Sequence, residues 1–251
     1  MSRLPVVALH GFMGSPDTFR GLVDGMSRPV LARELPVPDP FVDDALSDAH
    51  DRVARCLLDS LETEGVSRFH LLGYSLGGRI AMHMARQAPE RVDHVILESA
   101  HPGLDDPRER EARRNHDAEW AKRIRTGWPD VLDAWYDQGV FASLPSELRT
   151  RLRSEKMARD PEFMARTLES LSLGRQRPLW EDLARSASPI LFVSGEMDDR
   201  YRGIGERLAA QSGPIRHQTL PGAGHVVHRE QPEAYLAALE SFLSLESSPQ
   251  R

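Results

Sequence analysis

The chain has 251 residues, of which 40% are hydrophobic and 28% are charged, and 32 Lys and Arg against 38 Asp and Glu give a formal net charge of −6. Such a chain is long enough for one globular domain with an insertion. The negative net charge excludes a basic surface field over the whole protein, of the kind that holds nucleic acid or an anionic membrane. We therefore expect neither as a partner.

The first apolar run of the chain ends at His10-Gly11, which is too short for the core of a signal peptide, and nowhere do 18 apolar residues follow one another. We therefore expect a cytoplasmic protein. Cys56 is the only cysteine, so neither an intrachain disulfide nor a cysteine-rich metal site can form. Its apolar neighbours Val53, Leu57 and Leu58 predict a buried position on a helix.

Short apolar runs alternate with longer segments of helical period, a pattern typical of an α/β protein whose mostly parallel sheet carries helices on both faces. We predict six strands: Leu4 to Leu9, Pro29 to Ala32, Phe69 to Gly73, His94 to Leu97, Pro189 to Ser194 and Ile215 to Thr219. Predicted helices open at Ser15-Pro16 and span Asp43 to Glu64, Leu76 to Gln87 and Pro232 to Leu245.

From His101 to Ser186 the strand pattern gives way to charged, helical sequence with Pro and Gly breaks. We interpret residues 101–186 as a helical cap inserted into a core formed by residues 1–100 and 187–251. Five basic residues gather in one part of this cap, against Glu155 alone: Arg149, Arg151, Arg153, Lys156 and Arg159. They favour the approach of a negatively charged small molecule, although a solvated helix face explains most of them equally well.

The segment Gly73-Tyr74-Ser75-Leu76-Gly77 follows a predicted strand and opens a predicted helix, which is the context of a nucleophile elbow. The sharp turn has no room for bulky flanking side chains, and it lifts the Ser75 hydroxyl to a helix N-terminus whose dipole favours developing negative charge. This pattern predicts Ser75 as the reactive hydroxyl.

A serine hydroxyl needs an imidazole to take its proton, and the imidazole needs a carboxylate to fix its tautomer. His225 follows the last strand and is the predicted base, with His228 as its near competitor. Asp198, after the fifth strand, is the predicted acid, and Glu98 and Asp199 are the alternatives. The chain order Ser, Asp, His is that of hydrolases with this elbow. The backbone N–H groups of Phe12 and Leu76 are the predicted oxyanion donors.

These pieces resemble the α/β-hydrolase superfamily over nearly the whole chain, without the usual leading hairpin. Within it, the chain looks most like the 2-succinyl-6-hydroxy-2,4-cyclohexadiene-1-carboxylate synthases of menaquinone biosynthesis, the MenH family. The motifs that carry this resemblance are LHGFMGS from Leu9, GYSLGGR from Gly73, ESAHPGL from Glu98, WYDQGVFASL from Trp135, SLGRQ from Ser172 and GEMDDRY from Gly195.

The resemblance implies a lyase that eliminates pyruvate from 2-succinyl-5-enolpyruvyl-6-hydroxy-3-cyclohexene-1-carboxylate, with no metal, nucleotide or redox cofactor. The implied partner is this small tricarboxylate, whereas the oligomeric state is not predicted. Arg79 and Arg113 match family positions that bind carboxylates, and Lys156 falls near a third basic position. Tyr74 and Trp135 match positions that line the cavity, although Trp135 and Tyr136 could instead be core aromatics of the cap.

The chain departs from the superfamily after the second predicted strand, where a Pro-Gly-His-Gly turn is common and Arg33 to Pro40 is rich in proline instead. Two other functions stay open. A carboxylester or thioester hydrolase would use Ser75 as a covalent nucleophile and would need no arginine cluster. A ligand receptor that keeps the fold without catalysis is the other.

Overall fold

Six parallel strands form the single sheet of the computed structural model, which describes residues 3–36, 49–211 and 213–244. The strands are β1 (Val6–Leu9), β2 (Val30–Arg33), β3 (Phe69–Tyr74), β4 (Val92–Glu98), β5 (Ile190–Gly195) and β6 (Ile215–Leu220), in the order β2-β1-β3-β4-β5-β6. All six predicted strands are confirmed, and so is the α/β fold class.

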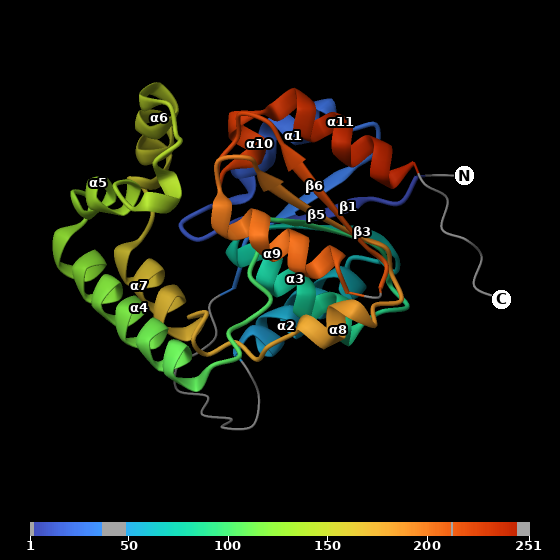
Figure 1. Cartoon of the computed structure of the whole chain (residues 1–251), viewed down its shortest axis with the longest axis horizontal. Coiled ribbons are helices and arrows are strands. Elements are labelled where there is room, and N and C mark those ends of the chain that lie inside the picture. Colours follow the sequence, from blue (N-terminus) through green and yellow to red (C-terminus); the bar gives the residue numbers. More distant parts are fainter. Residues whose placement is uncertain (1–2, 37–48, 212, 245–251) are drawn as a thin grey trace.

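Helices cover both faces of the sheet (Figure 1). One apolar cluster joins the sheet to α2 (Ala49–Thr63), α3 (Leu76–Gln87), α8 (Trp180–Ala184) and α9 (Asp199–Ala209). The other joins it to η1 (Pro16–Phe19), α1 (Arg20–Gly25), α10 (Val227–Glu230) and α11 (Pro232–Leu243). Because β3, β4 and β5 are covered on both sides, their residues are buried almost continuously rather than alternately.

The helix predicted from Asp43 is observed as α2, which begins at Ala49; residues 43–48 lie outside the described part, as does most of the proline-rich segment after Leu35. The prediction that Cys56 is buried was wrong, because its side chain is exposed. The helix buries Val53, Leu57 and Leu61. One residue turns an α-helix by about 100°, which carries Cys56 away from that stripe.

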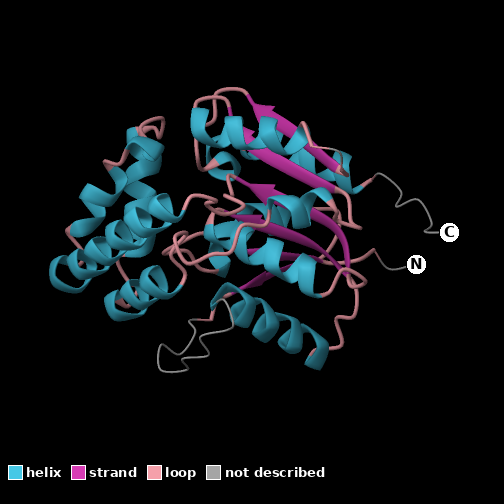
Figure 2. Ribbon diagram, turned by 60° about the horizontal axis from the view of Figure 1, so that its bottom comes forward, coloured by secondary structure: helices cyan, strands magenta, loops and turns pink. Residues whose placement is uncertain are grey.

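Between β4 and β5 the chain forms α4 (Pro107–Gly127), α5 (Val131–Tyr136), η2 (Gly139–Phe141), α6 (Ser146–Lys156), α7 (Pro161–Ser170) and α8. Figure 2 shows that the helices α4 to α7 form a group beside the sheet rather than on its faces. Helices α4, α5 and α7 share an apolar cluster around Trp120, Leu132 and Met164. Trp180 and Leu183 of α8 pack instead in the cluster beneath the sheet. Within the described ranges, no helix is both long and apolar enough to cross a membrane.

Candidate active site

Ser75 lies in a strained turn between β3 and α3. Its φ of 51° and ψ of −110° are rare for a residue with a side chain, and strain of this kind concentrates at functional positions. A Cβ on Gly73 would lie 2.5 Å from the backbone of Gly77 and Gly78, so the turn requires the absence of a side chain there. The Ser75 N–H donates to the carbonyl of Glu98 at 2.9 Å, which fastens the turn to β4.

His225 and Asp198 are brought together from two loops at the carboxyl edge of the sheet. Nδ1 of His225 lies 2.8 Å from Oδ2 of Asp198, and both side chains are buried. Asp198 also accepts a hydrogen bond from the backbone N–H of Tyr201, whose ring centroid lies 4.8 Å from that of His225. Asp199 is exposed and pairs with Arg202. The structure therefore places Asp198, and not its neighbour, against the predicted base.

The competing histidine and the competing acid form a separate pair. Nδ1 of His228 lies 2.8 and 2.9 Å from the two carboxylate oxygens of Glu98, and the backbone N–H of His228 donates to the same carboxylate. The Glu98 side chain is fully buried. The ring of Tyr74 lies 4.9 Å from the ring of His228 and 5.6 Å from that of His225.

A cavity of about 570 Å³ opens above the elbow and contains all three predicted catalytic residues in its walls, Ser75, Asp198 and His225. Within the described residues, the Ser75 hydroxyl makes no hydrogen bond to His225; such bonds are often long before substrate binds. The arrangement suits a hydroxyl that loses its proton to an imidazole whose other nitrogen is held by a carboxylate.

The two residues that carry the predicted oxyanion amides, Phe12 and Leu76, line a cavity together with Ser75. Leu76 is the first residue of α3, so its N–H has no partner four residues earlier in the helix, and Leu76 and Ser75 line an inner cavity of about 80 Å³. Phe12 lines both this inner cavity and the larger one. The donor roles of both amides stay predictions.

Arg79 and Arg113 also line the inner cavity with Ser75. The buried guanidinium of Arg79 donates to the carbonyl of Leu171 at 2.8 Å and to Oε1 of Gln176 at 3.4 Å, so it also ties α3 to the end of the cap. Nε of Arg113 donates to both carboxylate oxygens of the buried Asp117 at 2.9 and 3.0 Å. In the described part of the chain Nη1 and Nη2 of Arg113 make no hydrogen bond, which leaves that edge of the fork for a ligand.

Two further cavity residues, Arg200 and His101, were not among the predicted site residues. Arg200 lines the larger cavity and directly follows Asp199 in the GEMDDRY segment. Its position at the start of the helix after β5 could have identified it as a site residue. His101 lines the inner cavity, and its pKa is lowered to about 3 by burial and then by neighbouring arginines, including Arg200, Arg79 and Arg113. Burial is the main reason that this histidine stays neutral, and the nearby arginines add a positive potential of the kind that favours anions.

Tyr74 and Trp135 line the cavity as expected. Trp135 also contacts Phe12 and Trp120, with ring centroids 5.1 Å away in both cases, so it belongs to the cap core as well as to the site. Tyr136 is buried in the cap core and does not line the Ser75 cavity. Burial, and then the charge of Glu98, hold the pKa of Tyr74 well above its ordinary value, so its hydroxyl stays protonated.

Lys156 does not line either cavity that contains Ser75. It lies at the end of α6, in the basic part of the cap. The four arginines there form ion pairs: Arg149 with Asp137, Arg151 with Glu155, Arg153 with Asp133 and Arg159 with Glu34. The described residues give Lys156 no such partner, and its side chain is 9% exposed.

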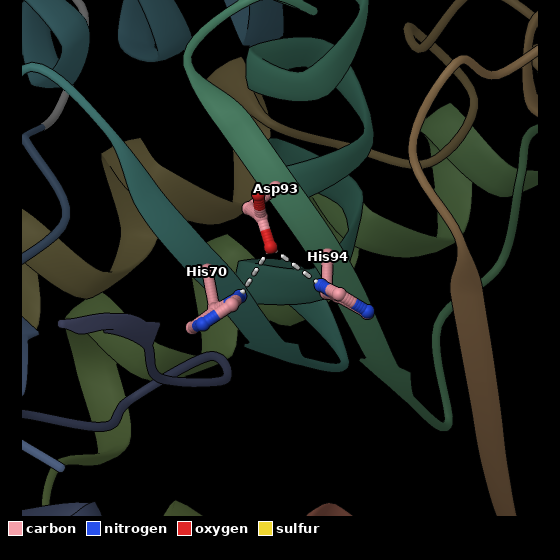
Figure 3. A group of neighbouring side chains, drawn as sticks. All are labelled: His70, Asp93 and His94. Atoms are coloured by element: carbon pink, nitrogen blue, oxygen red, sulfur yellow. Dashed lines mark hydrogen bonds and ion pairs between the residues drawn. The ribbon is translucent and has the colours of Figure 1, made fainter. Parts of the chain in front are cut away.

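One group of side chains outside this site is of a kind that binds metals. His70, Asp93 and His94 meet at the amino ends of β3 and β4, opposite the edge that carries Ser75 (Figure 3). Nη1 of Arg28 lies 2.8 Å from Nε2 of His70 and can only donate, so Nδ1 of His70 carries the proton and faces Oδ2 of Asp93. His70 therefore cannot offer Nδ1 to a metal while that contact stands, and the group fits an ion-pair network better.

Residues 6–238 match the model of the alpha/beta hydrolase family. Among curated proteins, the chain is 36% identical over 241 residues to a 2-succinyl-6-hydroxy-2,4-cyclohexadiene-1-carboxylate synthase of Klebsiella pneumoniae (strain 342), covering 95% of this chain and 93% of that protein. It is 37% identical over 242 residues to the synthase of Enterobacter sp. (strain 638), covering 96% and 92%.

Two solved structures show the same fold. MenH from S. aureus superimposes with a TM-score of 0.87 at 24% identity, covering 97% of this chain and 94% of that one. A thermophilic esterase from Thermogutta terrifontis superimposes with a TM-score of 0.80 at 22% identity, covering 96% and 90%. At these identities the structures support the fold alone, since a synthase and an esterase share it.

Proposed function

The chain belongs to the alpha/beta hydrolase family and to its lyase branch of MenH-type synthases, and from that premise we propose that it eliminates pyruvate from 2-succinyl-5-enolpyruvyl-6-hydroxy-3-cyclohexene-1-carboxylate. The observation that carries the proposal is the cluster of guanidinium groups around the elbow. Arg79 and Arg113 line the inner cavity with Ser75, as an anionic substrate requires and a neutral ester does not.

The proposed reaction begins at the ring carbon next to the succinyl carbonyl. His225, oriented by Asp198, takes the hydroxyl proton of Ser75, and the resulting alkoxide removes the proton from that carbon. The electron pair moves into the ring, the ring double bond shifts, and the carbon–oxygen bond to enolpyruvate breaks. Enolpyruvate then becomes pyruvate, and the ring is left as a conjugated diene. The amides of Phe12 and Leu76 are suited to stabilise negative charge on the carbonyl oxygen.

The arginines would hold the carboxylates while this happens. The outer edge of Arg113 is suited to a two-point contact with a substrate carboxylate, because Asp117 fixes the opposite edge. Tyr74 and Trp135 would pack against the apolar face of the substrate's six-membered ring. The same triad could instead attack an ester, so the substrate must be tested directly.

The test supplies freshly made substrate and records pyruvate release and diene absorbance together, beside a panel of p-nitrophenyl esters. We expect equal amounts of pyruvate and diene, loss of both in Ser75→Ala, and negligible ester cleavage. Ser60→Ala, on the exposed face of α2, is the matched control and should behave as the wild type. Ester turnover without pyruvate would overturn the proposal in favour of a hydrolase.

A further inference from the structure

The loop that carries His225 is rich in glycine. It spans residues 221–226, with Gly222 in a left-handed conformation at a φ of 67° and Gly224 directly before the histidine. Glycine loses more conformational freedom on folding than any other residue, so such a loop does not hold a side chain in place by itself. Because a base must stay within hydrogen-bond reach of the proton that it takes, contacts from outside the loop have to fix His225.

Glu230 makes such contacts on both sides of the histidine. Its Oε2 accepts the backbone N–H of Gly224 at 2.9 Å, and its Oε1 accepts the backbone N–H of Val226, also at 2.9 Å. These two amides belong to the residues immediately before and after His225. Hydrogen bonds to an ionised acceptor are roughly twice as strong as neutral ones. One carboxylate therefore holds the backbone at two points, with the imidazole between them.

Glu230 is itself attached to the core of the molecule. It is the last residue of α10, whose Val227 is fully buried in the apolar cluster that packs against the sheet. On the same short helix, the backbone N–H of His228 donates to the buried carboxylate of Glu98. The contacts of Glu230 therefore join the glycine-rich loop to a fixed part of the fold.

The same carboxylate also reaches the cap. The hydroxyl of Ser143, between η2 and α6, donates to Oε2 of Glu230 at 3.2 Å, and Ser143 lines the cavity that contains Ser75. A Cβ at Gly224 would lie 1.8 Å from Oγ of Ser143, so the cap and the histidine loop approach too closely for a side chain on the loop. The cap and the loop thus share one acceptor.

We propose that Glu230 is a positioning residue for the base. Its carboxylate fixes the loop that carries His225, and its contact with Ser143 makes the place of that loop depend on how the cap is docked. Glu230 is not among the residues that line the Ser75 cavity, and Asp198 already holds Nδ1 of His225, so the effect of Glu230 passes through His225. This inference rests on the proposed function, in which His225 is the base.

Glu230→Ala should lower kcat for pyruvate release about ten- to a hundredfold, because a displaced base no longer reaches the proton of Ser75. KM should change little, since Arg79 and Arg113 are untouched. Glu230→Gln keeps the size of the side chain but offers one acceptor oxygen instead of two, so its kcat should fall between those of the wild type and Glu230→Ala. Glu233→Gln, exposed on α11, is the matched control and should keep the wild-type kcat.

Proton NMR of the intact protein gives a readout that needs no substrate. The Nδ1 proton that His225 shares with Asp198 resonates at low field, and the loss of this signal in His225→Ala assigns it. The signal should shift or broaden in Glu230→Ala and stay unchanged in Glu233→Gln. If Glu230→Ala lowers Tm but leaves either kcat or this signal as in the wild type, Glu230 only stabilises the fold and the proposal fails. If the wild type releases no pyruvate, the proposed function fails, whereas the signal still decides whether Glu230 positions His225.

Ser143→Ala tests the link to the cap. It removes the contact with Glu230 and leaves both amide contacts in place, so we expect a smaller loss of kcat than in Glu230→Ala. In the double variant the loss should equal that of Glu230→Ala alone, because the contact is already gone. Losses that multiply would show that Ser143 acts independently of Glu230, and the dependence on the docked cap would be wrong.

Discussion

His225 and His228 stand three residues apart at the end of one loop, yet their Nδ1 atoms face different carboxylates, Asp198 and Glu98. The ring of Tyr74 contacts both imidazoles. Both histidines are thus held by an acid, but only His225 lines the cavity that contains Ser75. The spatial separation of the two pairs, rather than the presence of a histidine–carboxylate contact, selects the base.

Replacing His225 by Ala should therefore lower kcat by about a thousandfold or more, because the Ser75 hydroxyl loses its proton acceptor. His228→Ala should leave kcat within about tenfold of the wild type and should instead lower Tm, because Glu98 becomes a buried carboxylate without its ring partner. Pyruvate release and thermal unfolding separate the two effects. A large loss of kcat in His228→Ala at unchanged Tm would assign the base to His228.

Replacing Arg113 by Gln should raise KM for the tricarboxylate about ten- to a hundredfold with a smaller change in kcat, since a charge-assisted contact to a carboxylate is worth about 1.5–3 kcal/mol. Steady-state pyruvate release gives both constants. Lys122→Gln, an exposed cation on the same helix, is the matched control and should leave KM unchanged. A loss in kcat alone would place Arg113 at the reacting centre instead of at a binding contact.

The parallel sheet could be predicted because most of its strands are short apolar runs that alternate with helical segments. The elbow could be predicted because Gly73 and Gly77 surround Ser75 at a strand–helix junction. Both are local patterns, and the topology of a parallel α/β sheet brings the loops after its strands to one edge. The triad residues therefore converge without any contact being known in advance.

Long-range contacts in the cap could not be predicted in the same way. The five basic residues that include Lys156 look alike in the sequence, but Arg149, Arg153 and Arg159 pair with acidic residues outside α6. Arg151 pairs with Glu155, four residues later on the same helix. Lys156 alone faces two cavities, and this depends on how α6 sits against η1. The exposed Cys56 shows a second limit of sequence patterns. Apolar neighbours in the sequence do not by themselves place a residue on the buried side of a helix.

Lys156→Met should stabilise the protein at neutral pH. Burial lowers the pKa of Lys156 to about 8 from an ordinary value of 10.5, so below pH 8 the folded protein bears the cost of a buried charge. Between pH 8 and 10.5 the folded state releases this proton before the unfolded state does, and the wild type gains stability. The advantage of Lys156→Met, about 1–3 kcal/mol at pH 7, should therefore shrink toward pH 10.5 in denaturant unfolding. An advantage that does not vary with pH would show that packing, not charge, is responsible.

The network at the amino ends of β3 and β4 predicts acid sensitivity. Burial lowers the pKa of His70 to about 4; the carboxylate of Asp93 opposes this shift, and His94, Arg28 and Arg68 add to it. In the unfolded chain the same ring has a pKa near 6.5. As the pH falls from 6.5 to 4, the unfolded state binds a proton that the folded state does not, so stability is lost across this window.

His70→Gln keeps an acceptor for Arg28 but cannot titrate, so its free energy of unfolding should fall less steeply between pH 6.5 and 4, by up to about 3 kcal/mol at the acid end. Urea unfolding at several pH values measures this slope. His116→Gln removes a histidine from an exposed position on α4 and should keep the wild-type slope. An unchanged slope in His70→Gln would mean that His70 takes up its proton in the folded state as readily as in the unfolded one, with Asp93 fully offsetting the cost of burial.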